Sequence, residues 1–196
     1  LLLCATVVGI GATRHPKRKP IAKSDPRIDS ITFLRAEWNN DTLDGFILHR
    51  HQFKFQPLFA SPQNICYIEL PPNSPRKIFF ADTILTTVSQ QAQHHDALAA
   101  VNGSYFDMDQ GNPVCFLRIK GQQIGENTPA TTDSIHRKYY QYATVVLNNG
   151  RPTLLVPDSN RLWEDSLKHA NIMTAGPMLL HNGATVPQRK DRTFVT

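Results

Sequence analysis

The sequence predicts an α+β fold, in which a mixed, largely antiparallel sheet of short strands and hairpins is accompanied by a few helices. Two observations carry this prediction. Short β-branched and aromatic runs alternate with Asn, Gly and Pro turn signals, whereas helical periodicity is confined to two modest segments. The length of 196 residues, with 40% hydrophobic and 19% charged residues, fits one globular domain.

Turn residues flanked by apolar runs divide the chain into expected strands. Extended segments are expected at residues 31–38, 43–59, 65–70, 77–80, 97–101, 115–119, 123–124, 142–147 and 152–156. Turns are expected at residues 39–41, 61–64, 120–122 and 148–150. Most of these segments lie next to each other in the sequence, which favours antiparallel pairing.

The clearest helix signal covers residues 86–95. Thr87 precedes the helix and Gln90 follows three residues later, which is the spacing of a capping box, and Val88 and Ala92 form an apolar stripe. A second, short helix is expected after Asp158 or Ser159, with Leu162, Trp163 and Leu167 facing inward.

The N-terminus suggests export. Residues 1–12 are apolar and uncharged, which is too short to span a bilayer, since a span needs about 20 residues. We expect a remnant of a signal peptide at residues 1–13, a basic Pro-rich linker at 14–30, and an extracytoplasmic, periplasmic or secreted protein. A buried N-terminal strand and the remnant of a membrane anchor are the alternatives. The basic cluster accounts for most of the net charge of +5, so no nucleic-acid partner is expected.

Cysteine and histidine spacing gives no metal site. Cys66 and Cys115 form one disulfide or remain two buried thiols, and neither belongs to a zinc-type spacing. His49 and His51 share one face of an extended segment, but no third ligand stands near them. The expectation is therefore no metal, with the cofactor unknown, and a partly exposed strand face for the two histidines.

The strongest functional signal is the stretch from Ala97 to Asp107. A short apolar run, expected to be a buried strand, leads into Asn102-Gly103, a pair that tolerates positive φ. Two aromatic residues and a carboxylate follow at once. A strand end that presents such groups is suited to a polar site, although an Asn-Gly hairpin turn with Tyr105 and Phe106 in the core is the structural alternative.

Three motifs in this order resemble those of one enzyme family. They are Thr87-Val88-Ser89-Gln90-Gln91-Ala92, Ala100-Val101-Asn102-Gly103-Ser104-Tyr105-Phe106 and Ala175-Gly176-Pro177-Met178-Leu179-Leu180-His181-Asn182-Gly183. Over residues 65–196 the chain resembles the phosphodiester glycosidase family, which includes the enzyme that uncovers mannose 6-phosphate by removing N-acetylglucosamine. The family continues with His-Pro-Arg-Thr-Ala-x-Gly and later motifs. Here Arg192-Thr193 is followed by Phe194-Val195, so we expect an incomplete, inactive N-terminal portion of such a domain at residues 31–196.

The resemblance implies a hydrolase that cleaves the C1–O bond of a sugar-1-phosphodiester in an exported glycan or glycoconjugate. Such a leaving group needs little protonation, so a clamp on the phosphate oxygens matters more than an acid. The implied catalytic residues are Asn102, Asp107 and Arg192, with Asp109 a further candidate carboxylate and the second carboxylate expected outside the chain. The implied substrate-binding residues are Gly103, Tyr105, Phe106, Gly176 and Pro177. A non-catalytic carbohydrate- or envelope-binding module and a metal-dependent hydrolase using His49 and His51 are the rival interpretations.

Overall fold

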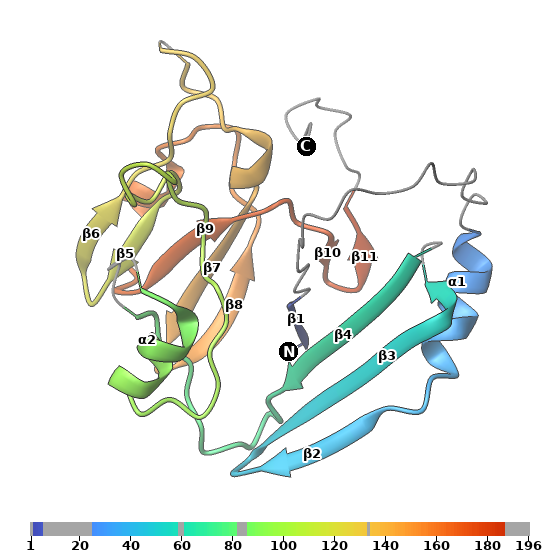
Figure 1. The fold of residues 1–196 in the computed structure, drawn as a ribbon. Helices are drawn as coiled ribbons and strands as arrows, with labels where there is room; N and C mark the ends of the chain where they lie inside the picture. The colour runs from blue at the N-terminus through green and yellow to red at the C-terminus, as the bar shows by residue number, and fades with distance from the viewer. Residues whose placement is uncertain (1, 6–24, 59–60, 82–85, 133, 187–196) are drawn as a thin grey trace. The chain divides into compact units, whose positions relative to one another are not determined.

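The computed structural model describes residues 2–5, 25–58, 61–81, 86–132 and 134–186 (Figure 1). The chain divides into two compact units, Leu1–Arg76 and Lys77–Thr196, whereas a single domain was expected from residue 31 onward. All strand pairings of the described residues are antiparallel. The predicted α+β class is therefore confirmed.

The first unit is a sheet with the strand order β1-β4-β3-β2 and one helix. Its elements are β1 (Leu2–Ala5), α1 (Pro26–Leu34), β2 (Asn39–Leu43), β3 (Phe46–Leu58) and β4 (Ser61–Glu69). The helix α1 lies beside β3 (Figure 1). Trp38 joins them, because its ring lies 5.1 Å from Phe33 of the helix and 6.3 Å from Phe53 of the strand, centroid to centroid. An aromatic cluster therefore forms the centre of this unit.

Three expectations for the first unit are wrong. Residues 26–34 are helical, so they are neither the end of a linker nor the start of a strand. Asp25 caps this helix by accepting the Arg27 N–H at 2.9 Å, and Pro26 occupies its first turn. Residues 39–41 form the exposed edge strand β2 instead of a turn, and the chain reverses at Asp44-Gly45, where φ is 45° and 90°. Residues 61–64 belong to β4.

Residues 2–5 form β1, which pairs antiparallel with β4. This observation agrees with the strand that was the alternative to a signal remnant. Most of the expected signal remnant and linker, residues 6–24, lies outside the described residues. Neither described helix has the length and apolar character that a bilayer crossing requires.

The second unit contains a five-stranded sheet with the order β6-β5-β9-β7-β8. Its elements are α2 (Val88–His94), β5 (Leu117–Ile119), β6 (Gln122–Gly125), η1 (Tyr139–Gln141), β7 (Ala143–Asn148), β8 (Arg151–Leu155), η2 (Trp163–Ser166), β9 (Ile172–Ala175), β10 (Leu180–His181) and β11 (Ala184–Thr185). Phe116, Val146 and Ile172 form its buried apolar core, with Leu155 and Leu167 packed against it.

Both predicted hairpins of the second unit are confirmed. The turn between β5 and β6 uses Lys120-Gly121 and the turn between β7 and β8 uses Asn149-Gly150, all at positive φ, as two-residue hairpin turns require. The helix α2 is also confirmed, with Thr87 as its cap and the reciprocal bond from Gln90 in place.

Other expectations for this unit are wrong. Residues 77–80 are not a strand and contact the hairpin through one bond, from the Ile78 N–H to the Gly150 carbonyl at 2.9 Å. Residues 97–101 are not a strand either. The second helix is the short 3-10 turn η2, which begins after Leu162. Of the two alternatives for the cysteines, the structure has the free thiols: Cys66 of the first unit is half-buried, and Cys115 of the second is buried.

Candidate functional site

Two of the predicted motifs meet at the end of β9. The Ser104 hydroxyl donates to the Thr174 carbonyl at 2.5 Å, and the Tyr105 hydroxyl donates to the Gly176 carbonyl at 2.9 Å. The Tyr105 carbonyl in turn accepts the Val114 N–H at 3.1 Å. Residues 102–107, hereafter the Asn102 loop, are therefore fixed against a strand end about 70 residues further along the chain.

The Asn102 loop is exposed, and the segment before it is not the buried strand that the sequence predicts. Val101 is 41% exposed, and Asn102 itself is exposed, with no hydrogen bond from its side chain within the described part of the chain. Tyr105 is 39% exposed and Phe106 is 46% exposed, so neither is a core residue. Neither Asn102 nor Gly103 has positive φ, so the expected turn geometry is wrong, whereas the carboxamide is open to solvent.

Asp107 closes a turn within its own loop. Its carboxylate accepts the backbone N–H groups of Gln110 at 2.9 Å and Asp109 at 2.8 Å, and these bonds lower the pKa of Asp107 because they stabilise its charged form. A carboxyl group with a low pKa is ionised at neutral pH and cannot serve as a general acid. Asp109 is exposed and contributes its amide, rather than its carboxylate, to this turn.

Gly176 permits a close backbone approach. A Cβ atom at this position would lie 3.1 Å from both the Tyr140 carbonyl oxygen and the Tyr142 nitrogen, so a larger residue would push this segment away. The peptide bond between Gly176 and Pro177 is cis. The Tyr140 ring lies 5.1 Å from the Tyr105 ring, centroid to centroid. Gly176 thus contacts both the Tyr140 backbone and Tyr105 of the Asn102 loop.

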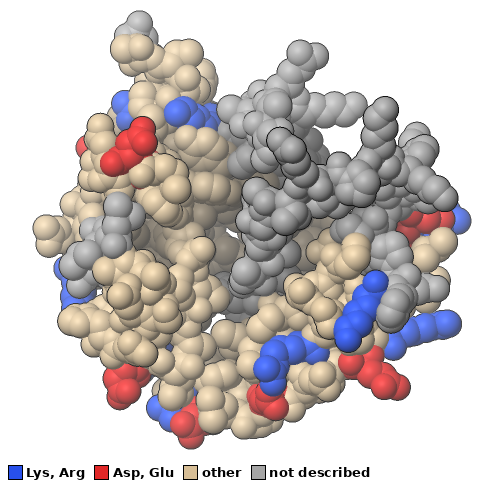
Figure 2. Space-filling view, viewed as in Figure 1, with Lys and Arg blue, Asp and Glu red and all other residues tan. Residues whose placement is uncertain are grey.

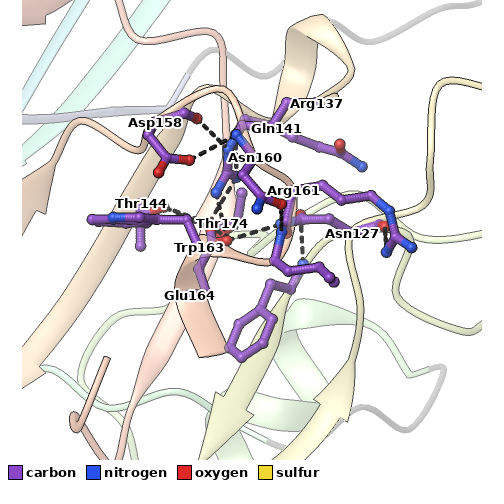
Figure 3. A network of polar contacts seen from close by, with 12 residues as sticks. Asn127, Arg137, Gln141, Thr144, Asp158, Asn160, Arg161, Trp163, Glu164 and Thr174 are labelled. Atoms are coloured by element: carbon purple, nitrogen blue, oxygen red, sulfur yellow. Dashed lines mark hydrogen bonds and ion pairs between the residues drawn. The ribbon is translucent and has the colours of Figure 1, made fainter. Parts of the chain in front are cut away.

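A buried polar network shares Thr174 with this site (Figure 3). Arg137 and Glu164 form an ion pair with 0% exposure of either side chain, through bonds of 2.6 and 2.8 Å. The Glu164 carboxylate also accepts the hydroxyl groups of Thr144 at 2.9 Å and Thr174 at 2.6 Å, and the amide of Asn127 at 3.1 Å. Every charge in the network is therefore paired and hydrogen-bonded, as burial demands.

The same network ties loops to the sheet. Arg137 donates to the carbonyls of Asp158 and Gln141, and the Gln141 amide donates to the carbonyls of Val114 and Thr128. Thr174 belongs to it through its hydroxyl, while its carbonyl accepts the Ser104 hydroxyl. The position of the Asn102 loop consequently depends on Glu164 through one residue of β9.

Sequence reasoning missed this network. Residues 126–138 are polar and rich in Thr and Pro, which predicts a loop that covers a site or moves freely. Counted as whole residues, however, Asn127 and Arg137 in that loop are only 1% and 4% exposed. One signal was available: Thr144 occupies an inward position of the predicted strand 142–147, among apolar neighbours. A polar residue at such a position requires a buried partner.

Cys115 lies beneath the Asn102 loop. Burial raises the pKa of its thiol, although hydrogen bonds from the Ser104 side chain and the Tyr105 backbone and the positive charge of Lys138 act in the opposite direction. The residue is 0% exposed. A buried, protonated thiol is inert, so Cys115 packs the site rather than reacting there.

The remaining predicted residues lie elsewhere. Arg192 is outside the described residues. In the first unit, His49 contacts Asn40 at 2.8 Å and Glu69 at 3.0 Å, and His51 contacts the Glu37 carbonyl at 2.7 Å. Within the described ranges, no three metal-binding side chains stand together. An open groove of about 670 Å³ lies between α1 and β3. His51 lines it, but none of the residues implied by the resemblance does.

The face seen in Figure 2 has no patch of a single charge sign among its described residues. Figure 2 shows acidic and basic side chains interspersed over the described surface in this view. Comparison with known protein families, with curated proteins and with solved structures found no match to this chain. The relationship to phosphodiester glycosidases therefore stays a prediction from the three motifs.

Proposed function

We propose that the second unit carries the substrate site of a hydrolase that cleaves the C1–O bond of a sugar-1-phosphodiester. The observation that supports this most is the bond from the Tyr105 hydroxyl to the Gly176 carbonyl, because it joins the two motifs on which the resemblance depends. Residues that are about 70 positions apart have no local reason to be neighbours.

In this proposal each exposed group has a separate task. The Asn102 carboxamide donates a hydrogen bond to a sugar hydroxyl or a phosphate oxygen, and Tyr105 and Phe106 offer apolar faces to the sugar ring. The Gly176-Pro177 backbone approaches the ligand from the opposite side. Asp107 is ionised, so it shapes the loop or balances positive charge at C1, and it donates no proton.

The test is release of sugar from a synthetic hexosamine 1-(methyl phosphodiester) by the full-length gene product, which would carry the second carboxylate that the resemblance implies. Asn102→Ala is expected to lower kcat/KM roughly 10- to 100-fold, since a hydrogen bond to a charged group is worth about 1.5–3 kcal/mol. Asn148→Ala is the matched control, because Asn148 is also exposed but lies far from the site. It is the last residue of β7, whereas the first residue, Ala143, pairs with Ala175 next to the site. Equal rates for wild type and Asn102→Ala would remove Asn102 from the site.

A carbohydrate-binding module is the second candidate. The exposed Tyr105 ring, which lies 5.1 Å from the half-buried Tyr140 ring, favours it, because solvent-accessible aromatic rings suit sugar binding without chemistry. Trp38 belongs to the first unit, and the Trp163 ring faces the buried Arg137 guanidinium, so neither is part of such a face. Sugar binding by calorimetry without any release of sugar from the diester would favour the module and contradict the hydrolase.

A further inference from the structure

Lys138 stands at the edge of the same site. Its ammonium nitrogen lies 5.9 Å from the centre of the Tyr140 ring, and that ring lies 5.1 Å from Tyr105. Tyr105 in turn is bonded to the Gly176 carbonyl. A cation, two aromatic rings and a strand end therefore follow one another across the surface beside the Asn102 loop.

The position of Lys138 is fixed while its charge remains available. Its backbone N–H donates to the side chain of Gln141 at 2.9 Å, and Gln141 is fully buried in the network around Glu164. The Lys138 side chain is half-buried, and no carboxylate of the described chain lies within ion-pair distance of its ammonium group. An ammonium group that is fixed in place without a neighbouring carboxylate attracts an anion.

The arginines of the neighbouring loops cannot take this role. Arg137 is enclosed with Glu164, and Arg161 donates to the carbonyls of Ser134 and Asn127. Both guanidinium groups are thus used inside the unit. Of these three cations, Lys138 is the one whose charge lies over the Tyr140 ring of the aromatic pair, whereas Arg137 faces Trp163.

We propose that Lys138 binds the phosphate of the substrate while Tyr105 and Tyr140 pack against its sugar ring. This assignment rests on the proposed function and names the residue that holds the phosphate group of its substrate. Lysine binds phosphate as a point charge, and a neighbouring aromatic face favours both the ammonium group and an apolar sugar face. Neutral glycosides then lack the main anchor of the site.

The test is calorimetric titration of the full chain with glucose 1-phosphate, inorganic phosphate and glucose. Lys138→Met is expected to weaken binding of both phosphate compounds roughly 10-fold or more and to leave glucose binding unchanged. Lys138→Arg should retain binding of both, because the charge is kept. Lys168→Met is the control, since Lys168 is exposed in the segment 167–170, which contacts Arg118 and Gly121 at the opposite end of β9.

The outcomes separate this inference from the proposed function. Unchanged affinity for glucose 1-phosphate in Lys138→Met, with a far-ultraviolet spectrum and melting curve like those of wild type, would overturn the assignment even if the diester is hydrolysed. Conversely, Lys138-dependent binding of glucose 1-phosphate without hydrolysis would support the assignment and contradict the hydrolase. If Lys138→Met unfolds, the Tyr140→Leu variant is titrated instead. Weaker binding of glucose with unchanged binding of inorganic phosphate would support the assignment, whereas an equal loss of affinity for both ligands would overturn it.

Discussion

Substituting either member of the buried Arg137–Glu164 pair is expected to destabilise the second unit strongly. Both side chains are 0% exposed, so neither charge has access to water once its partner is gone. Glu164→Gln leaves a buried guanidinium without a counter-charge, and Arg137→Met leaves a buried carboxylate. Each substitution should lower the free energy of unfolding by about 3–5 kcal/mol, the usual cost of an uncompensated buried charge.

The double variant identifies the charge as the cause. Arg137→Met combined with Glu164→Gln buries no charge, so its cost should fall below the sum of the single costs by about 1 kcal/mol or more. Thr174→Val is a milder probe that removes one 2.6 Å bond to the carboxylate. We expect it to cost about 1.5–3 kcal/mol, whereas Thr153→Val on the exposed part of β8 should stay within about 0.5 kcal/mol.

The two tryptophans make the measurement selective. Trp163 belongs to the second unit, where the Arg137 guanidinium lies 5.9 Å from its ring, and Trp38 belongs to the first. In a Trp38→Phe background, urea unfolding followed by tryptophan fluorescence therefore reports on the second unit. Single substitutions that cost less than about 1 kcal/mol, or costs that simply add in the double variant, would refute the reasoning.

Three further predictions concern single residues. Thr87→Ala should destabilise α2 by about 1 kcal/mol and speed its amide hydrogen exchange, whereas Thr87→Ser should not; equal exchange in both variants would contradict the capping role. In the native protein at pH 8, iodoacetamide should alkylate Cys115 far more slowly than Cys66, because burial raises the pKa of the Cys115 thiol; in urea the two rates should be similar. The stability linked to this thiol is present below its ordinary pKa and is lost as the pH rises through the raised value. The pKa of Asp107 is lowered, so its turn should be intact above the ordinary value of 3.8 and loosen only as the pH falls through the lower one; amide NMR shifts of Asp109 and Gln110 that titrate at 3.8 or above would contradict this.

Local signals predicted the parts of the fold that depend on local chemistry. The Asn149-Gly150 turn and the Thr87–Gln90 cap are determined by residues next to each other, so the pattern was sufficient. The helix α1 was missed because its apolar spacing resembles a strand, although Asp25 followed by Pro26 is a helix-start signal. The apolar run 97–101 was misassigned because hydrophobicity alone does not reveal that Val101 is exposed.

The candidate site was predictable in its residues but not in its support. Asn102 and Gly176 were identified from the motifs, and the structure brings their segments together. The ion pair that holds them joins Arg137 to Glu164, 27 positions apart, in segments without regular periodicity. Such long-range polar pairing leaves no period in the sequence, so only the inward Thr144 of a predicted strand pointed to it.

The strand β2 has a consequence for self-association. It ends the sheet of the first unit, all five of its residues are exposed, and Asp41 on it pairs with Arg50 of β3. An unpaired strand edge is a template for a second molecule, and hydrophilic or charged side chains along it discourage that contact. The polar side chains of the Asn-Asn-Asp sequence, which the turn signals predicted to be a turn, thus disfavour pairing of β2 with a strand of a second copy and so disfavour aggregation.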